Sequence, residues 1–466
     1  MPKSGIAPKV LDAITAICGP SGLLTGNDVA ARASNWRGTE NCQAGAIARP
    51  ANSGQVSEIL KVCHSFQVPV IGAGGLTGTV HGTDATPDQL LMSFERMNAI
   101  ESIDLDGRCI TVQAGAPMQK VQEIARKNGL LFGVDLGARG SATIGGNIST
   151  NAGGNQVLRY GMMREQVLGL EAVLSDGTIV SSMNTLLKNN AGYDLKQLFV
   201  GTEGTLGLVT RAVLRLHSQP RSENTALLAF SDFSTLTKCF RALAREFGSD
   251  LTAFEVMWQE HYRIVAVQSG RHAAPLPDTH AIYAIVDYCG MEPERDASMF
   301  ERVLGDMIEA GHIADAVLSN SYEQRERLWA IREDLEGLVH SLAPAVGFDV
   351  GLPITHMEAY IRQVQSDLTD AFPEGSRSVF FGHLGDGNLH VIVAPRPWSE
   401  DAREIVEGVV YRPLQAIGGT ISAEHGIGLE KKRWLHLSRT PAEIALMKVL
   451  KSTLDPHNLL NRGKIF

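Results

Sequence analysis

The chain's 47 glycines are unevenly distributed, and this distribution restricts the folds open to the chain more than any other feature. They gather at 72–82, 129–161, 201–207 and 382–428, whereas 221–380 is poorer in glycine and alternates between helix and strand patterns. Loops rich in glycine, serine, threonine and asparagine cannot build a core, but they can wrap an extended polar ligand with hydrogen bonds. The first part of the chain is therefore predicted to bind a large cofactor.

Bulk composition is that of an ordinary globular protein. The 466 residues exceed what one hydrophobic core supports, so two domains are expected. Hydrophobic residues make up 44% of the chain and charged residues 20%, which is usual for a globular protein in water. The net charge of −9 argues against nucleic acid as a partner, because phosphate binding needs a cationic surface.

No membrane-spanning or targeting segment is expected. The sequence has no apolar run of about 18 residues, and Met1–Leu24 lacks the cationic start and apolar core of a secretory signal. The six cysteines lack CxxC spacing, which predicts reduced thiols and excludes an iron–sulfur module. We therefore expect a cytoplasmic protein, with peripheral attachment to a membrane left open.

A domain boundary is expected near 215–222, where polar residues and a proline indicate a loop. Before it, the pattern at 53–67 predicts an amphipathic helix and 68–71 a short buried strand. After it, 281–286 predicts an apolar strand and 323–342 a helix.

The first glycine cluster, Gly72–Gly78, directly follows the expected strand. Glycines let backbone N–H groups approach a pyrophosphate closely, and successive amides form an anion-binding nest. The spacing matches neither a Rossmann fingerprint nor a P-loop. One such turn alone is more often a tight strand connection, but the further clusters at 135–161 and 201–210 favour a cofactor site.

Two C-terminal motifs, 382–390 and 423–428, combine three histidines with a carboxylate. Strand-like segments flank the turn 385–388, so we expect a hairpin with that four-residue loop, in which His383 and His390 lie directly opposite each other. Glu424 would complete a metal site that suits Zn²⁺ best, with Mn²⁺, Co²⁺ or Fe²⁺ as alternatives. The competing interpretation is a pair of structural histidines that cap the hairpin.

Together these motifs resemble a known family. They are Gly-Gly-Leu-Thr-Gly at 74–78, Ile-Gly-Gly-Asn at 144–147, Thr-Asn-Ala-Gly-Gly at 150–154, Arg-Tyr-Gly at 159–161, Gly-Thr-Glu-Gly-Thr-Leu-Gly at 201–207, and the two C-terminal motifs. The chain resembles the FAD-binding PCMH-type (vanillyl-alcohol-oxidase) flavoproteins, and within them the D-2-hydroxyacid dehydrogenases that act on D-lactate or D-2-hydroxyglutarate. The resemblance extends from Asn35 to Lys464.

The resemblance implies FAD bound without a covalent link, although His81 stands where relatives usually have a small residue. It assigns the following residues to the cofactor: Gly72, Gly74, Gly75, Leu76, Thr77, Gly78, Leu136, Gly137, Ser141, Gly145, Gly146, Asn147, Thr150, Asn151, Gly153, Gly161, Glu203, Gly207, Val209 and Asn461.

The resemblance also assigns roles to the C-terminal motifs. It makes His383, His390 and Glu424 the metal ligands and His425 the catalytic base, which also contacts the substrate. A Lewis acid on the substrate lowers the pKa of its hydroxyl, a neutral imidazole accepts the proton, and flavin N5 accepts the hydride. Glycines at 426 and 428 let the backbone bend so that Glu424 and His425 both face the site.

Substrate recognition is expected at Arg332. In the branch of the family that the chain resembles, an arginine at this position binds the substrate carboxylate. A guanidinium suits this role, because its fork-shaped group of N–H donors matches the two carboxylate oxygens. A surface arginine paired with Glu333 or Glu336 is the alternative. Relatives that act on 2-hydroxyglutarate often carry lysine where Gly347 stands and asparagine where Ile392 stands. These departures favour a monocarboxylate such as D-lactate, with Phe348 and Ile392 in contact with its tail.

The fold class implied is α+β. We expect a PCMH-type FAD-binding domain at 1–220, a substrate (cap) domain at 221–423 with an antiparallel sheet covered by helices, and a segment 424–466 that returns to the FAD domain. The electron acceptor is expected to be a quinone, a cytochrome or an electron-transfer flavoprotein, and a homodimer is left open. Competing functions are a metal-independent FAD alcohol oxidase and a flavin-binding module without catalysis.

Overall fold

The computed structural model describes residues 5–36, 38 and 40–466, which divide into two compact units. The first unit holds the chain up to Gly154, Tyr160–Gln219 and Glu424–Phe466. The second holds Asn155–Arg159 and Pro220–Ala423. The chain therefore leaves the first unit and returns to it at its C-terminal end, and the short helix α6 (Val157–Tyr160) spans a crossing point.

The first unit contains two main β-sheets and a two-stranded ribbon. The four-stranded sheet has the order β1-β2-β4-β3, and β4 runs parallel to both β2 and β3. The five-stranded sheet has the order β5-β6-β10-β8-β9 and is antiparallel throughout. The strands are β1 (Leu23–Leu24), β2 (Ala46–Ala48), β3 (Val70–Ala73), β4 (Leu90–Ser93), β5 (Ile100–Asp104), β6 (Cys109–Gln113), β7 (Leu130–Leu131), β8 (Val167–Val173), β9 (Ile179–Ser182), β10 (Leu208–Arg215) and β11 (His217–Ser218).

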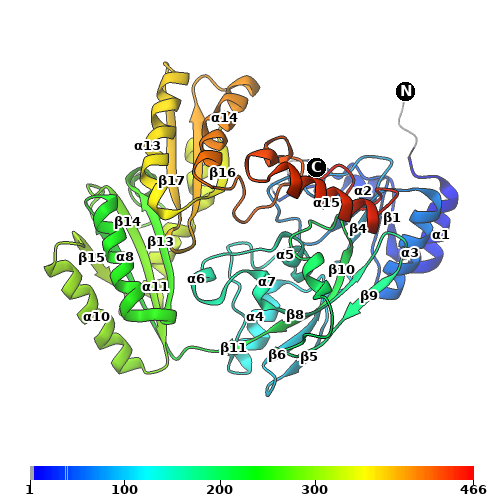
Figure 1. Ribbon diagram of the computed structural model, residues 1–466, viewed down its shortest axis with the longest axis horizontal. Coiled ribbons are helices and arrows are strands. Elements are labelled where there is room, and N and C mark those ends of the chain that lie inside the picture. The colour runs from blue at the N-terminus through cyan, green and yellow to red at the C-terminus, as the bar shows by residue number, and fades with distance from the viewer. Residues whose placement is uncertain (1–4, 37, 39) are drawn as a thin grey trace. The chain divides into compact units, whose positions relative to one another are not determined.

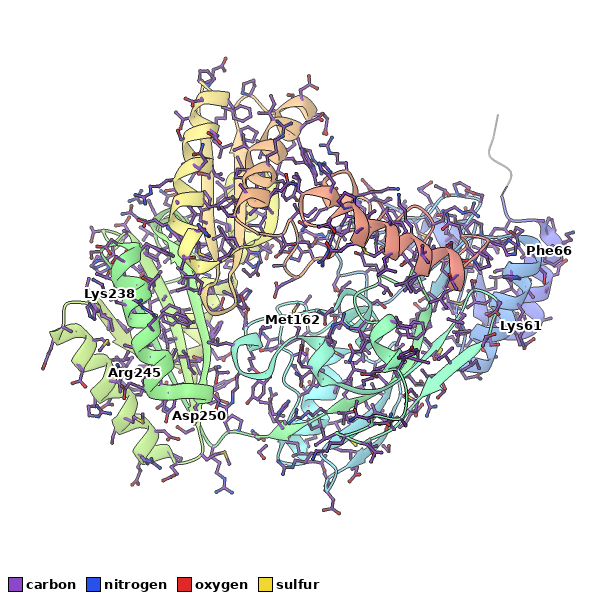
Figure 2. All side chains as sticks on the ribbon, in the orientation of Figure 1. Lys61, Phe66, Met162, Lys238, Arg245 and Asp250 are labelled. Carbon is purple, nitrogen blue, oxygen red and sulfur yellow. The ribbon has the colours of Figure 1, made fainter. Side chains whose placement is uncertain are left out.

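Helix α3 (Ser53–Phe66) shows why the predicted helix forms where it does. The side chain of Asn52 accepts a hydrogen bond from Gln55 N at 3.0 Å and so satisfies one of the unpaired amides at the helix start. Apolar residues with helical spacing bury one face, while Lys61 and Phe66 lie on exposed parts of the helix (Figure 2). The predicted helix at 53–67 is thereby confirmed.

The other helices of the first unit are short or lie near the chain ends. They are α1 (Pro8–Cys18), η1 (Pro20–Gly22), α2 (Asn27–Ala30), α4 (Met118–Lys127), α5 (Ile144–Thr150), α7 (Met163–Gln166), η2 (Leu195–Leu198), η6 (Lys432–Leu437) and α15 (Pro441–Leu454).

The C-terminal tail pairs with β3, an edge strand of the four-stranded sheet. Val70 N donates to Leu459 O, and Asn461 N donates to Val70 O, both at 2.8 Å. Because Val70 begins β3, this pairing brings Asn461 beside the glycine turn that follows the same strand.

The second unit is a seven-stranded antiparallel sheet with the order β15-β12-β14-β13-β17-β18-β16 (Figure 1). Together with the sheets of the first unit, it confirms the predicted α+β class. Its strands are β12 (Ser222–Phe230), β13 (Leu251–Trp258), β14 (Ile282–Gly290), β15 (Asp315–Leu318), β16 (Val346–Gly351), β17 (Ser376–His383) and β18 (Asn388–Pro395).

Helices cover both faces of this sheet, so its core is buried on two sides. Helices α8 (Phe233–Phe247), α10 (Pro293–Glu309), α13 (Ile354–Ala371) and α14 (Glu400–Ala416) pack on one face. Lys238 and Arg245 lie on the outer side of α8 (Figure 2). The other face is covered by α9 (Gln259–Tyr262), the π-helical turn η4 (Arg263–Gln268), α11 (Tyr322–Glu333) and α12 (Leu335–Leu342); η3 (Gly248–Asp250) and η5 (Leu384–Asp386) are short turns.

The prediction of one helix over 323–342 is wrong in one respect, because the helix breaks at Asp334. This residue leaves the helical conformation and its side chain accepts a hydrogen bond from Gly337 N at 2.9 Å. Asp334 therefore starts α12 as its cap, since a short polar side chain competes with the helical hydrogen bond at such a position.

Candidate active site

The first two glycine clusters lie against each other in the first unit. A Cβ atom on Gly75 would come within 1.8 Å of Ser141 O, and one on Gly74 within 2.4 Å of Thr143 Oγ1. Side chains at 74 and 75 would therefore collide with the second cluster, so the close approach of the two backbones requires glycine at both positions.

The third cluster and the C-terminal tail join the same assembly. Asn461 Oδ1 accepts a hydrogen bond from Gly72 N at 2.9 Å, and its Nδ2 donates to Glu203 O. A Cβ on Gly72 would meet Leu208 Cδ2 at 2.9 Å. Four segments that are distant in sequence thus meet around the turn that follows β3.

These segments fit a polar cofactor such as FAD. Thr143 Oγ1 is buried and has no hydrogen-bond partner, which a bound polar ligand would supply. Gly78 and Gly137 have open space where a side chain would stand, and Leu76 adopts a left-handed backbone with φ of 56°. An unsatisfied hydroxyl beside a glycine-rich turn is the arrangement expected of a site that binds a polar ligand.

The remaining predicted cofactor residues lie in the same unit. Helix α5 carries Gly145, Gly146, Asn147 and Thr150, and Asn151 follows it in the left-handed conformation with φ of 51°. The others lie in loops or on β10: Thr77, Leu136, Ser141, Gly153, Gly161, Gly207 and Val209.

The two histidines of the second unit share one sheet face, but their predicted pairing is wrong. His383 pairs with Asn388, and His390 pairs with Phe381, so the histidines are diagonal neighbours with ring centroids 5.5 Å apart. The loop starts one residue earlier than expected, at Leu384, because Gly387 takes the left-handed turn position with φ of 78° and Asn388 joins the strand. A shift of two in the pairing keeps both side chains on the same face.

A buried carboxylate that sequence reasoning missed holds one of these histidines. Glu255 on β13 pairs with His383 across the sheet, and its Oε1 lies 2.6 Å from His383 Nδ1. Burial opposes ionisation of Glu255, but His383 and Arg332 beside it hold the pKa of the carboxyl below its usual value. The ionised carboxylate accepts the Nδ1 proton, which makes Nε2 the nitrogen with a lone pair for a metal.

Arg332 is buried beside Glu255 and does not lie on the surface. Its Nη2 is 2.9 Å from Glu255 Oε2, and its guanidinium carbon lies 4.9 Å from the centre of the Phe381 ring. The alternative pairing with Glu333 or Glu336 is therefore wrong. Nε of Arg332 is buried and makes no hydrogen bond, so this atom is a candidate to bind a substrate carboxylate.

A second buried histidine, His261, lies on the same side of the sheet. Its ring centre is 4.8 Å from that of Phe381, and its Nδ1 is buried without a partner. Burial, aided by Arg332, lowers the pKa of His261 to about 3, so the ring is neutral at neutral pH. Nothing in its sequence context, Gln259–Tyr262, marks it as part of this cluster.

Asp349 and Asp386 add negative charge near His390 and His383. Asp349 Oδ1 lies 4.0 Å from His390 Nδ1 and accepts a hydrogen bond from Asn388 Nδ2 at 2.8 Å. Burial raises the pKa of Asp386 to about 6, which His383 only partly opposes. Such a surplus of acidic groups beside two imidazoles is favourable for a bound cation.

Phe348 does not lie with these residues. It pairs with Val391, so it projects to the opposite face of the sheet, where it packs edge-on against Tyr411 at 5.2 Å. The predicted contact between Phe348 and the substrate tail is therefore wrong, because alternate residues of a strand point to opposite faces. Gly347 and Ile392 pair with each other on the face of His390.

The loop with Glu424 and His425 belongs to the first unit and has no regular secondary structure. Glu424 Oε1 accepts a hydrogen bond from Gly154 N at 2.8 Å. Gly426 and Gly428 have φ of 85° and 51°, as the predicted bend requires. The carboxylate of Glu203, a residue predicted to contact the cofactor, accepts hydrogen bonds from the amides of Ile427 and Gly428.

Within the first unit, the glycine-lined cradle has the architecture of a PCMH-type FAD-binding fold. The solved structure of alkyldihydroxyacetonephosphate synthase shares this fold, with a TM-score of 0.76 over 99% of this chain and 87% of that chain at 17% identity. The FAD binding domain family matches residues 44–182, and the family of FAD linked oxidases, C-terminal domain, matches residues 219–465.

The chain belongs to the family of FAD-dependent D-2-hydroxyacid dehydrogenases, which act on CH–OH donors. It is 39% identical over 431 residues to "D-2-hydroxyglutarate dehydrogenase" of Xanthomonas citri pv. viticola, which covers 90% of this chain and 89% of that protein. It is 35% identical over 420 residues to "Putative D-lactate dehydrogenase C713.03, mitochondrial" of Schizosaccharomyces pombe, with 88% and 80% covered. Among the residues that the structure describes, no helix is long and apolar enough to cross a membrane.

Proposed function

We propose that the chain oxidises a D-2-hydroxyacid to the 2-oxoacid with FAD and a divalent metal, and that it prefers a monocarboxylate such as D-lactate. His383, His390 and Glu424 hold the metal, and His425 accepts the hydroxyl proton. The observation that carries the proposal is the buried Glu255 behind His383, since a carboxylate bonded to Nδ1 is the usual support of a metal-binding imidazole.

The donor set fits the metal. Two imidazoles and one carboxylate suit Zn²⁺ best and leave coordination positions for substrate; Mn²⁺, Co²⁺ and Fe²⁺ are the alternatives. A metal bound there would polarise the substrate hydroxyl and lower its pKa. Glu424 is oriented for this role by Gly154, whose N donates a hydrogen bond to its Oε1.

His425 provides the base. It follows Glu424 directly and precedes a left-handed glycine, so the backbone bend lets both side chains serve one site. Its imidazole nitrogen takes the proton from the substrate hydroxyl. Bound FAD supplies the electron acceptor for the hydride. Residues 72–78 would hold the pyrophosphate, and the segment 136–154 would contact the rest of the cofactor.

Two positions support a monocarboxylate substrate. Gly347 leaves open space on the face of His390, and Ile392 is apolar, so neither provides a charge for a second carboxylate. The relatives' names include both substrates, because one is named for D-2-hydroxyglutarate and another for D-lactate. Arg332, whose buried Nε makes no hydrogen bond, binds the carboxylate next to the hydroxyl.

An anaerobic panel of hydroxyacids tests the proposal. Flavin absorbance should bleach with D-lactate faster than with D-2-hydroxyglutarate and should not bleach with L-lactate. Elemental analysis should find about one metal ion per chain, and chelation should stop bleaching until the metal is restored. Full activity of the metal-free protein would favour a metal-independent oxidase, and no bleaching with any D-2-hydroxyacid would refute the proposed reaction.

A further inference from the structure

A buried carboxylate of the first unit is bonded to the backbone of the loop that carries His425. Glu203 Oε1 accepts a hydrogen bond from Ile427 N at 2.6 Å, and Oε2 accepts one from Gly428 N at 2.8 Å. We infer that Glu203 is a positioning residue that holds the loop Glu424–Gly428 in the conformation that catalysis requires. The catalytic part of this inference rests on the proposed role of His425, whereas the structural part does not.

The main chain of Glu203 is itself held in place, so its carboxylate is a fixed point. Its backbone is left-handed with φ of 51°, its N donates to Ser149 O at 2.8 Å, and its O accepts from Asn461 Nδ2. Such a backbone conformation is costly for a residue with a side chain and persists only where surrounding bonds enforce it. The cofactor segments and the C-terminal tail supply those bonds.

The loop fits closely around the carboxylate. A Cβ on Gly426 would come within 2.8 Å of Glu203 Oε1, so only glycine allows this approach. From other directions, Val80 O accepts from Leu429 N at 3.0 Å, and Ile465 N donates to Gly428 O at 3.0 Å. The backbone directly after His425 is thus held by partners from three separate segments.

The chemistry of this contact requires a carboxylate. Each oxygen accepts one backbone N–H, and an amide side chain would turn an NH₂ group toward one of these donors. Loss of an acceptor leaves a buried N–H without a partner, which shifts the loop or opens it to water. A displacement of about 1 Å of a reacting group can slow a reaction by about 100-fold.

The test compares Glu203→Gln with Glu171→Gln in the FAD-loaded protein. Glu171 is a matched control, because it is a buried carboxylate of the same unit that accepts from Thr210 Oγ1 at 2.9 Å and makes no bond to the loop. Hydrogen–deuterium exchange of a peptide that spans 424–430 is the first readout. We expect at least about tenfold faster exchange of two amides in Glu203→Gln and unchanged exchange in Glu171→Gln.

Anaerobic flavin reduction by D-lactate is the second readout. We expect about one FAD per chain in both variants, with the limiting reduction rate about 10- to 100-fold lower in Glu203→Gln only. Unchanged exchange at 424–430 would overturn the positioning role, and so would loss of FAD from Glu203→Gln, because that result assigns Glu203 to the cofactor. Faster exchange in a protein whose wild type reduces with no D-2-hydroxyacid would refute the proposed function and leave the loop contact supported.

Discussion

In both halves of the proposed active site a buried carboxylate supports the segment that carries a histidine, but one histidine lies on a strand and the other lies in a loop. In the second unit, His383 and His390 project from neighbouring strands, and the buried Glu255 bonds to the His383 ring. In the first unit, His425 lies in a loop, and the buried Glu203 bonds to the main chain that follows it.

The difference lies in what each carboxylate has to control. Strand pairing already fixes the backbone of His383, so Glu255 has only to set which ring nitrogen carries the proton. The loop that carries His425 has no strand pairing to hold it, so Glu203 has to fix the backbone of that loop. The contrast teaches that a side chain on a strand needs support at its ring, and one on a loop needs support at its peptide bonds.

The largest expected effect is on the loop side, at the base itself. His425→Ala should keep FAD and metal but lower the rate of flavin reduction by about 10²- to 10⁴-fold, because no group then accepts the hydroxyl proton. Stopped-flow absorbance under anaerobic conditions measures the rate. The control is His436→Ala, an exposed histidine of the same unit. Reduction at the wild-type rate would place the base elsewhere.

The strand side is tested next, through Glu255→Gln. We expect metal affinity to fall about 10- to 100-fold, because the amide no longer fixes His383 with its proton on Nδ1. Competition with a chromogenic chelator measures the affinity without any turnover. Glu260→Gln is the control, since Glu260 pairs with Arg377 on the same unit and not with a histidine. Equal affinities in the wild type and Glu255→Gln would mean that Glu255 has no part in metal binding.

A smaller effect is expected from Gly347→Lys, which asks whether the strand side also sets substrate choice. Open space at this position admits the side chain, and its ammonium group adds a partner for a second carboxylate. The ratio of kcat/KM for D-2-hydroxyglutarate to that for D-lactate should rise about tenfold, or about 1.4 kcal/mol. Gly347→Met, of similar length without charge, should not raise it; an equal rise in both variants would contradict the charge argument.

The smallest effect concerns Lys464, which supports the loop side. Its Nζ donates to His81 O and Asp84 O, and burial lowers its pKa to about 8 despite the nearby carboxylates. The unfolded side chain keeps its proton up to about 10.4, so folding releases a proton between these pH values and the free energy of unfolding rises with pH there.

Between pH 7.5 and pH 9, we expect the free energy of unfolding of the wild type to rise by about 1 kcal/mol more than that of Lys464→Met. Urea unfolding at both pH values measures this, and the difference between wild type and variant cancels other titrating groups. Identical pH dependence in the two proteins would show that the lysine has an ordinary pKa in the folded state.

Local sequence signals were sufficient for several elements of the fold. The apolar spacing at 53–67 predicts α3, and residues 282–286 of the predicted apolar strand lie in β14. The glycine motifs identify the family, because close backbone contacts such as that of Gly75 with Ser141 tolerate no side chain. These signals work since each depends on residues that are near in sequence or on the absence of a side chain.

Other features could not be read from the chain. Glu255 lies in the apolar segment Leu251–Trp258, 128 positions before His383, and no spacing rule links the two. The diagonal arrangement of His383 and His390 depends on which residue takes the left-handed turn, which was Gly387. Arg332 was predicted as a substrate ligand, and its burial beside Glu255 comes from the packing of α11 on the sheet.

The sequence by itself determined the family, the α+β class and the candidate residues, because motifs of glycine, histidine and glutamate carry their chemistry in the residue types. Only the tertiary structure decided what supports those residues. It placed Glu255 against the ring of His383, and Glu203 against the backbone of the loop that carries His425. Both contacts join segments that are far apart in the chain. A buried charge finds its partner by packing and not by sequence position, so these contacts exist only once the chain has folded.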